Sequence, residues 1–284
     1  MNKKKILLFG STSYVGYFLK NYLKKFYDVE TFEDLSNEKI NFEVKDLKSL
    51  IPEFYKYNII INLIHDHSNN IKINLHIIDL ILREIKDKQK LIFFSSSQII
   101  EGNSSKYTWV KREIEELIKN RNANYIILRP SLMIDEKIYT RKTKQQFLIT
   151  LIDIIKKYNI AIMLANGKFY LNIISVFDVF KIIENIINKD LKNKIISIYN
   201  HKSLTFIEII KIIQSEFNIK IYKILIPMFL LKFLSKCSKK IIPDENLKAL
   251  KFKPTQFSSI DNNDIKFYIT QNNSDIIKKL FQSL

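Results

Sequence analysis

Apolar runs of strand length alternate with helical periodicity along the first half of the chain. The runs that predict strands lie at residues 5–9, 29–32, 59–64, 90–94 and 125–128. The segments that predict amphipathic helices lie at residues 15–26, 74–85 and 107–119. Continuous apolar runs are typical of parallel strands that are covered on both faces. The alternation therefore predicts an α/β fold with a doubly wound parallel sheet, as in Rossmann folds.

The pattern loosens after Arg129-Pro130. Residues 148–158 and 177–187 predict two further helices, and residues 173–176 predict a strand that returns to the sheet. No low-complexity linker and no internal repeat separates the two halves. We expect the remaining residues to form a smaller C-terminal lobe.

The first predicted strand and the helix after it are joined by a turn that contains two of the chain's only 4 glycines. Gly10 would allow the tight turn, and Gly16 would let the helix pack closely on the sheet. Amides at the start of this helix would bind a pyrophosphate. Ser13, which precedes Tyr14 and Val15, replaces the middle glycine of the usual motif. The turn from Gly10 to Gly16 is our candidate cofactor site, for NAD or NADP.

An acidic residue at the end of the second strand is the usual partner of the ribose hydroxyls in a dinucleotide site. Glu33 has this position, with Asp34 beside it. A carboxylate there would repel a 2′-phosphate, which favours NAD, although NADP stays open. The alternative is that both acids belong to a solvated loop.

A serine, a tyrosine and a lysine form the candidate catalytic group. Ser97 follows the strand at 90–94, and Tyr107 and Lys111 stand four residues apart at the start of the next helix. Residues at this spacing share one helix face, and a neighbouring ammonium favours the phenolate of a tyrosine. Tyr107 is thus a candidate general acid/base, and Ser97 would hydrogen-bond the substrate oxygen. Tyr and Lys are so abundant here that position, not spacing, supports the assignment.

Taken in order, these motifs resemble the extended short-chain dehydrogenases/reductases, in the NAD-dependent epimerase/dehydratase group that acts on nucleotide sugars. The resemblance covers roughly the first two-thirds of the chain. Besides the glycine turn and the Tyr107/Lys111 pair, it rests on Asp46-Leu47 after an expected third strand, Asn62 to His65, Asn74, Phe93 to Ser97, Gly102, Leu128 to Pro130, and Ser175 to Asp178.

The resemblance implies a role for individual residues. The catalytic residues would be Ser97, Tyr107 and Lys111, and Lys111 would also bind the nicotinamide ribose. The other contacts would be Asp46 and Leu47 beside the adenine, Ile64 and His65 along the cofactor, and Pro130 and Ser131 beside the nicotinamide. The resemblance implies a dinucleotide-binding domain at 1–165, with 170–200 returning to its sheet, and a substrate-binding lobe at 201–284.

Two departures from the family pattern narrow the expected reaction. The segment from Gly102 to Tyr107 is short, so the loop near the substrate is trimmed. Gln98-Ile99 stands where many sugar dehydratases have an acidic pair, which argues against a 4,6-dehydratase. A 4-epimerase and a 4-ketoreductase both remain open. The alternative is a catalytically inactive dinucleotide-binding regulator or scaffold.

Composition adds little to this expectation. The net charge of +17 raises the possibility of a nucleic-acid partner, but the lysines are scattered, so we expect none. A single cysteine, Cys237, excludes an intrachain disulfide and suits the cytoplasm. The longest apolar stretch, Ile224 to Leu234, contains Pro227 and Lys232, so we expect no membrane span.

Three smaller expectations complete the sequence analysis. His65-Asp66-His67 offers too few ligands for a metal site, so we expect no metal. The carboxylates Glu113, Glu115 and Glu116 fit a solvated helix face paired with lysines. A homodimer through the helix at 107–119 is possible, because this family often dimerises there.

Overall fold

The computed structural model describes residues 3–36, 46–66, 68–100, 105–121, 123–134, 147–227, 230 and 269–284. The chain divides into two compact units. The first comprises residues 1–99, 106–130 and 180–197, and the second comprises 100–105, 131–179 and 198–284. The division by binding role at 165 and 201 stays a prediction, because compactness does not say what a segment binds.

A six-stranded sheet forms the centre of the first unit, with the strand order β10-β5-β4-β3-β1-β2. Its strands are β1 (Lys5–Phe9), β2 (Asp28–Thr31), β3 (Ile59–Asn62), β4 (Lys90–Phe94), β5 (Asn124–Pro130) and β10 (Lys194–Ile198). The pairs β1–β2, β1–β3, β3–β4 and β4–β5 are parallel. The predicted doubly wound parallel sheet is therefore confirmed.

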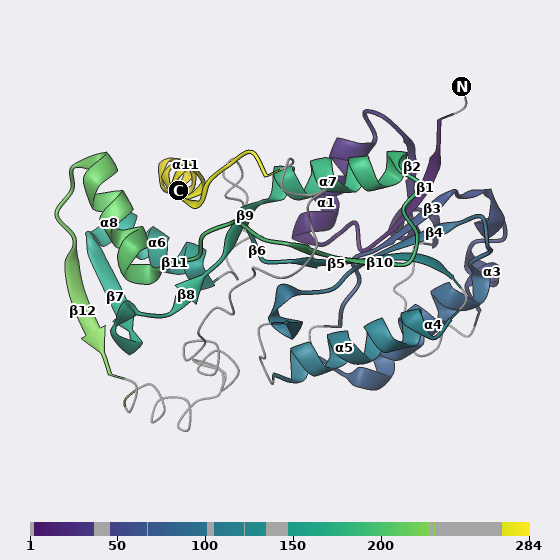
Figure 1. Cartoon of the computed structure of the whole chain (residues 1–284), viewed down its shortest axis with the longest axis horizontal. Coiled ribbons are helices and arrows are strands. Elements are labelled where there is room, and N and C mark those ends of the chain that lie inside the picture. Colours follow the sequence, from purple (N-terminus) through teal and green to yellow (C-terminus); the bar gives the residue numbers. More distant parts are fainter. Residues whose placement is uncertain are drawn as a thin grey trace. The chain divides into compact units, whose positions relative to one another are not determined.

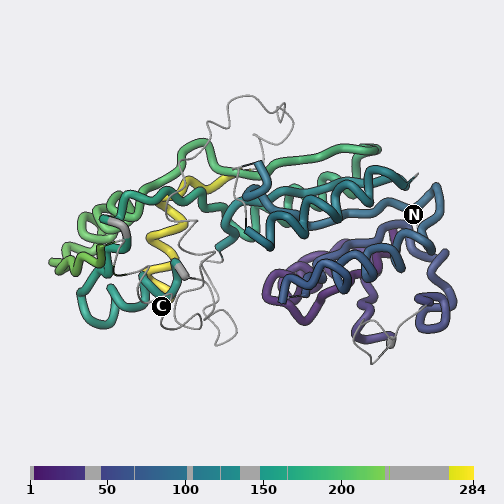
Figure 2. Tube along the Cα trace, turned by 90° about the horizontal axis from the view of Figure 1, so that it is seen from below, coloured from purple at the N-terminus to yellow at the C-terminus, as the bar shows by residue number. Residues whose placement is uncertain are grey.

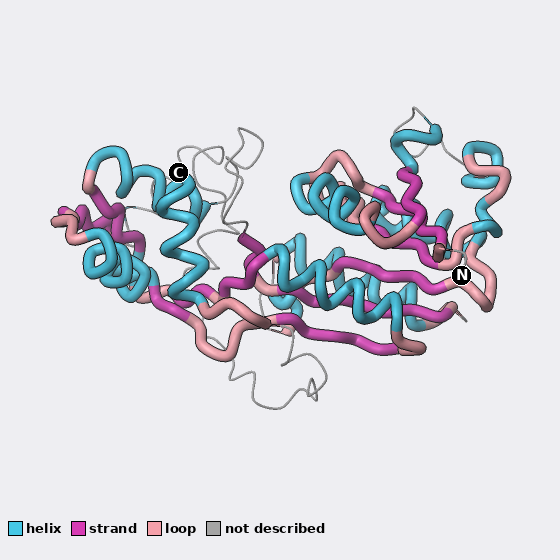
Figure 3. The backbone as a smooth tube through the Cα atoms, turned by 90° about the horizontal axis from the view of Figure 1, so that it is seen from above, coloured by secondary structure: helices cyan, strands magenta, loops and turns pink. Residues whose placement is uncertain are grey.

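Helices cover both faces of this sheet. Helix α1 (Tyr14–Leu23) and the part of α7 (Val176–Asn188) from Phe180 onward lie on one face (Figures 1 and 3). Helices α4 (Ile71–Glu84) and α5 (Lys106–Lys119) lie side by side on the other (Figures 1 and 2). The shorter elements of this unit are α2 (Phe32–Ser36), α3 (Leu47–Leu50) and the 3₁₀ helices η1 (Phe54–Lys56) and η2 (Ser97–Ile99).

The apolar strand residues explain this layering. All five residues of β4 are buried, so the strand needs a helix layer on each side. On the side of α4 and α5, one core joins strand residues to helix residues, among them Leu91, Phe93, Ile77, Ile81, Val110 and Ile114. Lys90 is buried too, and its Nζ donates to the carbonyls of Ile186 (3.2 Å) and Lys189 (2.9 Å) near the end of α7.

Capping residues set the helix starts that hydrophobic periodicity places less well. Asn70 accepts a hydrogen bond from the amide of Lys72, so α4 begins at Ile71 and not at residue 74. Ser13 caps α1 in the same way by accepting from the amide of Gly16. Both side chains satisfy an amide that has no partner within the helix.

The strand predicted at 173–176 forms, but it does not join the main sheet. Strand β9 (Ile173–Ser175) pairs in parallel with β6 (Leu132–Ile134). The strand that returns to the main sheet is β10, which still lies in the predicted range 170–200. The prediction was wrong because a short apolar run does not show which strand it will pair with.

The second unit has its own apolar core. Its other elements are α6 (Phe147–Tyr158), β7 (Ile160–Leu164), η4 (Ala165–Gly167), β8 (Tyr170–Leu171), β11 (Leu204–Thr205), α8 (Phe206–Phe217), β12 (Tyr222–Ile226) and α11 (Asn273–Ser283). The buried carboxylate of Asp178 accepts hydrogen bonds from the amides of Thr270 and Gln271 and from the hydroxyl of Thr270. These bonds anchor the segment before α11. None of the helices in the described ranges is long and apolar enough to cross a membrane.

Several sequence expectations fall outside the described residues. The third strand expected before Asp46 would lie in residues 37–45. Gly102, His67, Cys237 and residues 103–104 of the trimmed loop are also outside the described part of the chain. These expectations stay untested.

The tight contact at Gly16 gives a stability prediction. A Cβ at this position would lie 2.0 Å from the carbonyl oxygen of Gly10, so Gly16→Ala must displace backbone. We expect a loss of about 1–3 kcal/mol of unfolding free energy, measured by urea denaturation. Asn21→Ala, at an exposed position of the same helix, is the control and should change stability by less than about 0.5 kcal/mol. Equal stability of the Gly16 variant and the wild type would contradict the close packing.

Candidate active site

The strand order reverses between β1 and β3, and their carboxyl ends meet there. Gly10 follows β1, and Leu63 and Ile64 follow β3. The backbone of Gly10 packs directly against the backbone of these two residues. The amide of Leu63 donates to the carbonyl of Phe9 over 3.0 Å. Ligands of doubly wound sheets bind at such a reversal point. Sequence and topology thus place the glycine turn and Ile64 at one location.

The turn after β1 has the geometry that its two glycines predict. Gly10 has a φ of +87°, which side-chain-bearing residues rarely adopt. Ser13 bridges the turn, because its hydroxyl donates to the carbonyl of Gly10 (2.7 Å) and accepts from the amide of Gly16 (3.1 Å). The first turn of α1, which includes Tyr14 and Val15, follows directly.

Glu33 folds back onto this turn from α2. Its two carboxylate oxygens accept from the amide of Gly10 (2.7 Å) and from the hydroxyl of Ser11 (2.9 Å). Asp34 instead forms an ion pair with Lys20, and this hydrogen bond lowers the pKa of Asp34. The two neighbouring acids therefore differ, because Glu33 binds the glycine turn whereas Asp34 forms an ion pair at the protein surface.

The predicted tyrosine and lysine meet on the inner face of α5. The Nζ of Lys111 donates to the carbonyl oxygen of Phe94 over 2.8 Å and lies 5.9 Å from the centre of the Tyr107 ring. The His65 ring packs edge-on against the Tyr107 ring at 4.9 Å, and its Nε2 hydrogen-bonds Asn69. Tyr107, Lys111 and His65 thus form one cluster beyond the ends of β3 and β4.

Burial controls the charge state of this cluster. It raises the pKa of the Tyr107 phenol, and a hydrogen bond with the side chain of Ser96 opposes the rise. It lowers the pKa of Lys111 to about 7, against a weaker upward effect of the Glu115 carboxylate. The sequence analysis expected a charged Lys111 to lower the pKa of Tyr107. Burial instead raises the pKa of Tyr107 and lowers that of Lys111. Both shifts favour the neutral forms of the phenol and the amine.

The first two of the three serines after β4 hydrogen-bond different residues of α5. The hydroxyl of Ser95 donates to Glu115, and the side chain of Ser96 hydrogen-bonds Tyr107. Ser97, the sequence candidate, is buried at the start of η2. Sequence analysis missed Ser96 as a neighbour of Tyr107, because a run of three serines carries no periodicity that separates them.

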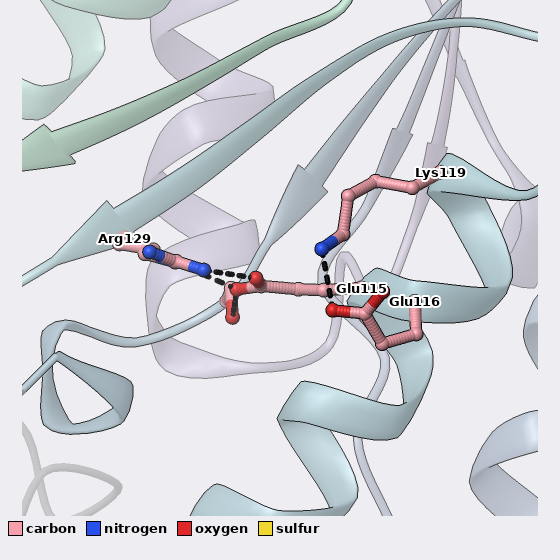
Figure 4. A network of polar contacts seen from close by, with 5 residues as sticks. Glu115, Glu116, Lys119 and Arg129 are labelled. Carbon is pink, nitrogen blue, oxygen red and sulfur yellow. Dashed lines mark hydrogen bonds and ion pairs between the residues drawn. The ribbon is translucent and has the colours of Figure 1, made fainter. Parts of the chain in front are cut away.

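Glu115 corrects the expectation of a fully solvated acidic face. Its side chain is only 1% exposed, and it forms a two-pronged ion pair with Arg129 of β5 (Figure 4). Glu116, by contrast, pairs with Lys119 at the surface, as expected (Figure 4). The prediction was wrong for Glu115 because that position lies on the face of α5 that packs on the sheet. A helical period of 3.6 could have shown this, since Tyr107, Lys111 and Glu115 share one face.

The remaining candidates are more dispersed. Leu47 is fully buried in the core, and Asp46 is exposed and caps α3 by accepting from the amide of Lys48. Pro130 is buried at the end of β5, and the next residue, Ser131, belongs to the second unit. The proposed contacts of these residues with adenine or nicotinamide stay predictions.

No family model matches the chain, and no curated protein matches it in sequence. Solved structures, however, match it over most of its length. The dTDP-4-dehydrorhamnose reductase of Bacillus anthracis strain Ames, in complex with NADP, is 16% identical, with a TM-score of 0.70 over 100% of both chains.

Two epimerases match to a similar extent. The UDP-glucuronic acid 4-epimerase of Bacillus cereus, in complex with UDP-glucuronic acid and NAD, is 14% identical, with a TM-score of 0.67 over 98% of each chain. The UDP-N-acetylglucosamine 4-epimerase of Methanobrevibacter ruminantium M1, in complex with UDP-N-acetylmuramic acid, is 16% identical, with a TM-score of 0.67 over 100% of this chain and 98% of the other. The likeness shows that this chain has the Rossmann-type α/β fold of nucleotide-sugar epimerases and reductases, which confirms the predicted resemblance at the level of the fold.

Proposed function

We propose that this chain is an NAD(P)-dependent enzyme that transfers hydride at a carbon of a nucleotide-activated sugar, as a 4-epimerase or a 4-ketoreductase. The observation that carries the proposal is the cluster of Tyr107, Lys111 and His65 beyond the ends of β3 and β4. This cluster pairs a proton-transferring phenol with an amine in a buried setting. Enzymes with the same fold, solved with nucleotide sugars and with NAD or NADP, support the substrate class and the cofactor.

The glycine turn fits a dinucleotide. The positive φ of Gly10 and the absence of a side chain at Gly16 bring α1 close to the end of β1, where its first amides can bind a pyrophosphate. Glu33 would accept hydrogen bonds from the ribose hydroxyls, and its negative charge favours NAD over NADP. Lys111 would bind the nicotinamide ribose. When bound, the cofactor supplies the acceptor or donor of a hydride.

Tyr107 would move the proton that accompanies hydride transfer. In the reducing direction the protonated phenol would donate its proton to a carbonyl oxygen of the substrate, and in the oxidising direction the phenolate would accept the proton of a substrate hydroxyl. Ser96 hydrogen-bonds this phenol, and Ser97 would hold the substrate oxygen. Protonation of Lys111, whose pKa is about 7, would favour the phenolate and so ease the oxidising direction.

One observation supports the alternative of a non-catalytic dinucleotide-binding scaffold. The hydroxyl of Ser13 already binds the amide of Gly16 and so competes for one of the donors that a pyrophosphate would use. Dinucleotide binding without turnover of any UDP- or dTDP-sugar would favour this alternative.

The role of Tyr107 is tested by Tyr107→Phe. We expect turnover of UDP- or dTDP-sugars to fall by about 10²-fold or more, because the proton donor is lost, while the Kd for NAD(H) or NADP(H) stays within about twofold. The exposed Tyr17 offers a matched control, and Tyr17→Phe should keep wild-type turnover. Unchanged turnover in the Tyr107 variant would contradict the assignment.

The buried amine of Lys111 predicts a pH dependence of stability. Its pKa is about 7 in the folded protein and 10.5 in the reference state, so the unfolded chain binds more protons between these values. Unfolding free energy should therefore rise with pH in this window, by about 1 kcal/mol per pH unit between about pH 8 and 10.

Lys111→Met isolates this contribution. Urea denaturation at several pH values should show that the rise is lost in the variant, while below about pH 7 the variant gains most relative to the wild type. Parallel curves for the two proteins would mean that the Lys111 amine is not desolvated in the folded state.

A further inference from the structure

Three consecutive residues at the end of β4 are tied to three residues on one face of α5. The carbonyl of Phe94 accepts from Lys111, the hydroxyl of Ser95 donates to Glu115, and the side chain of Ser96 hydrogen-bonds Tyr107. The helix residues stand four apart, so each lies one turn from the next. These three contacts define a register between the strand end and α5, that is, which residue of the helix lies opposite which residue of the strand end.

Glu115 also forms an ion pair with a residue of a neighbouring strand. Arg129 of β5 binds both of its carboxylate oxygens, through Nε at 2.9 Å and through a terminal nitrogen (Figure 4). The same Glu115 oxygen that accepts from Arg129 Nε also accepts from Ser95. The Ser95 amide donates to the carbonyl of Leu128, the residue before Arg129, over 2.7 Å. Ser95 is therefore held through both its backbone and its side chain.

This arrangement joins two proposed catalytic residues, Tyr107 and Lys111, to Glu115, which has no role in the reaction proposed above. We propose that Glu115, held by Arg129, is a positioning residue that acts through Ser95 to set the placement of Ser96 and Ser97 relative to Tyr107. The inference rests on the proposed function, because it assigns Glu115 a role in that reaction. An ion pair with a buried carboxylate stabilises a fold no better than well-packed apolar side chains do, which is consistent with a role in geometry.

Electrostatics supports the same role. The Glu115 carboxylate, one turn away, counteracts the effect of burial on the pKa of Lys111. Loss of its charge would therefore leave the amine more neutral. Glu115 thus affects two of the proposed catalytic residues. Its charge affects the pKa of Lys111, and its contact with the serine turn (Ser95 to Ser97) affects the position of Tyr107 relative to Ser96 and Ser97.

Two variants separate positioning from folding. Ser95→Ala removes the hydrogen bond and leaves the ion pair in place. Glu115→Met/Arg129→Met removes both charges together, so that neither is left buried without its partner, which single removal would do at a large cost in stability. Glu116→Met is the matched control on the same helix, since Glu116 pairs with Lys119 at the surface.

The first readout is amide hydrogen exchange, which needs neither substrate nor cofactor. The Ser95 amide donates to the Leu128 carbonyl, the Gln98 amide to the Ser96 hydroxyl and the Ile99 amide to the Ser96 carbonyl. We expect about tenfold faster exchange in Ser95 to Ile99 for Ser95→Ala and for the double variant, with unchanged protection of β1 and β3. The Glu116 variant should exchange as the wild type does.

The second readout is kinetic. In both variants kcat should fall about tenfold while KM for the sugar and the Kd for the dinucleotide stay constant, since only the alignment of the reacting groups is lost. Adding Ser95→Ala to the double variant should have no further effect, because Glu115 acts on the serine turn through Ser95 and that contact is already lost.

Wild-type exchange and wild-type kcat in both variants would overturn the inference, and so would a further loss in the triple variant. If the wild-type protein turns over no nucleotide sugar, the proposed function fails, and the exchange measurement alone still decides whether Glu115 holds the serine turn.

Discussion

The buried contact between the Lys111 amine and the last carbonyl of β4 constrains the rest of the candidate site. An amine this deep in the protein loses its hydration, which lowers its pKa to about 7, and the Phe94 carbonyl oxygen at 2.8 Å partly replaces the lost water. The contact fixes α5 against the sheet. It thereby fixes the direction in which Tyr107, one turn earlier, faces the ends of β3 and β4.

The sheet supplies the other half of the site. Because β1, β3 and β4 are parallel neighbours, the residues that follow them lie at one edge. The glycine turn, Ile64 and the serine turn are far apart in sequence and are brought to that edge by strand order alone. Glu33 then closes on the glycine turn from α2, so an acid that the dinucleotide proposal requires is already held beside it.

The sequence predicted the fold well because buried parallel strands are apolar throughout and helices have a separate period. The strands at 5–9 and 90–94 form with the predicted bounds. Pairing was harder: β9 and β10 have similar short apolar runs, and only tertiary contacts decide which of them joins the main sheet.

The candidate site was predicted in part, for physical reasons. The turn at Gly10 was predictable because a positive φ favours glycine, whereas Tyr107 and Lys111 were proposed from their position at the start of the helix after the serine run, and their roles stay predictions. Glu115 was assigned to a solvated face because it stands among other acids, although its spacing from Tyr107 and Lys111 places it on the helix face that packs on the sheet. Ser96 was missed because the exact turn after β4 decides which serine faces Tyr107.

The central claim is that the cluster around Tyr107 serves hydride transfer to or from a nicotinamide. The most direct measurement is the absorbance of reduced nicotinamide after the wild-type protein is mixed with NAD or NADP and a panel of UDP- and dTDP-sugars, and with the reduced cofactors and the corresponding 4-keto sugars. We expect at least one pair to produce or consume reduced nicotinamide, transiently on the protein for an epimerase and in net amounts for a reductase. No change of absorbance with any pair would contradict the account, whether or not the protein binds a dinucleotide.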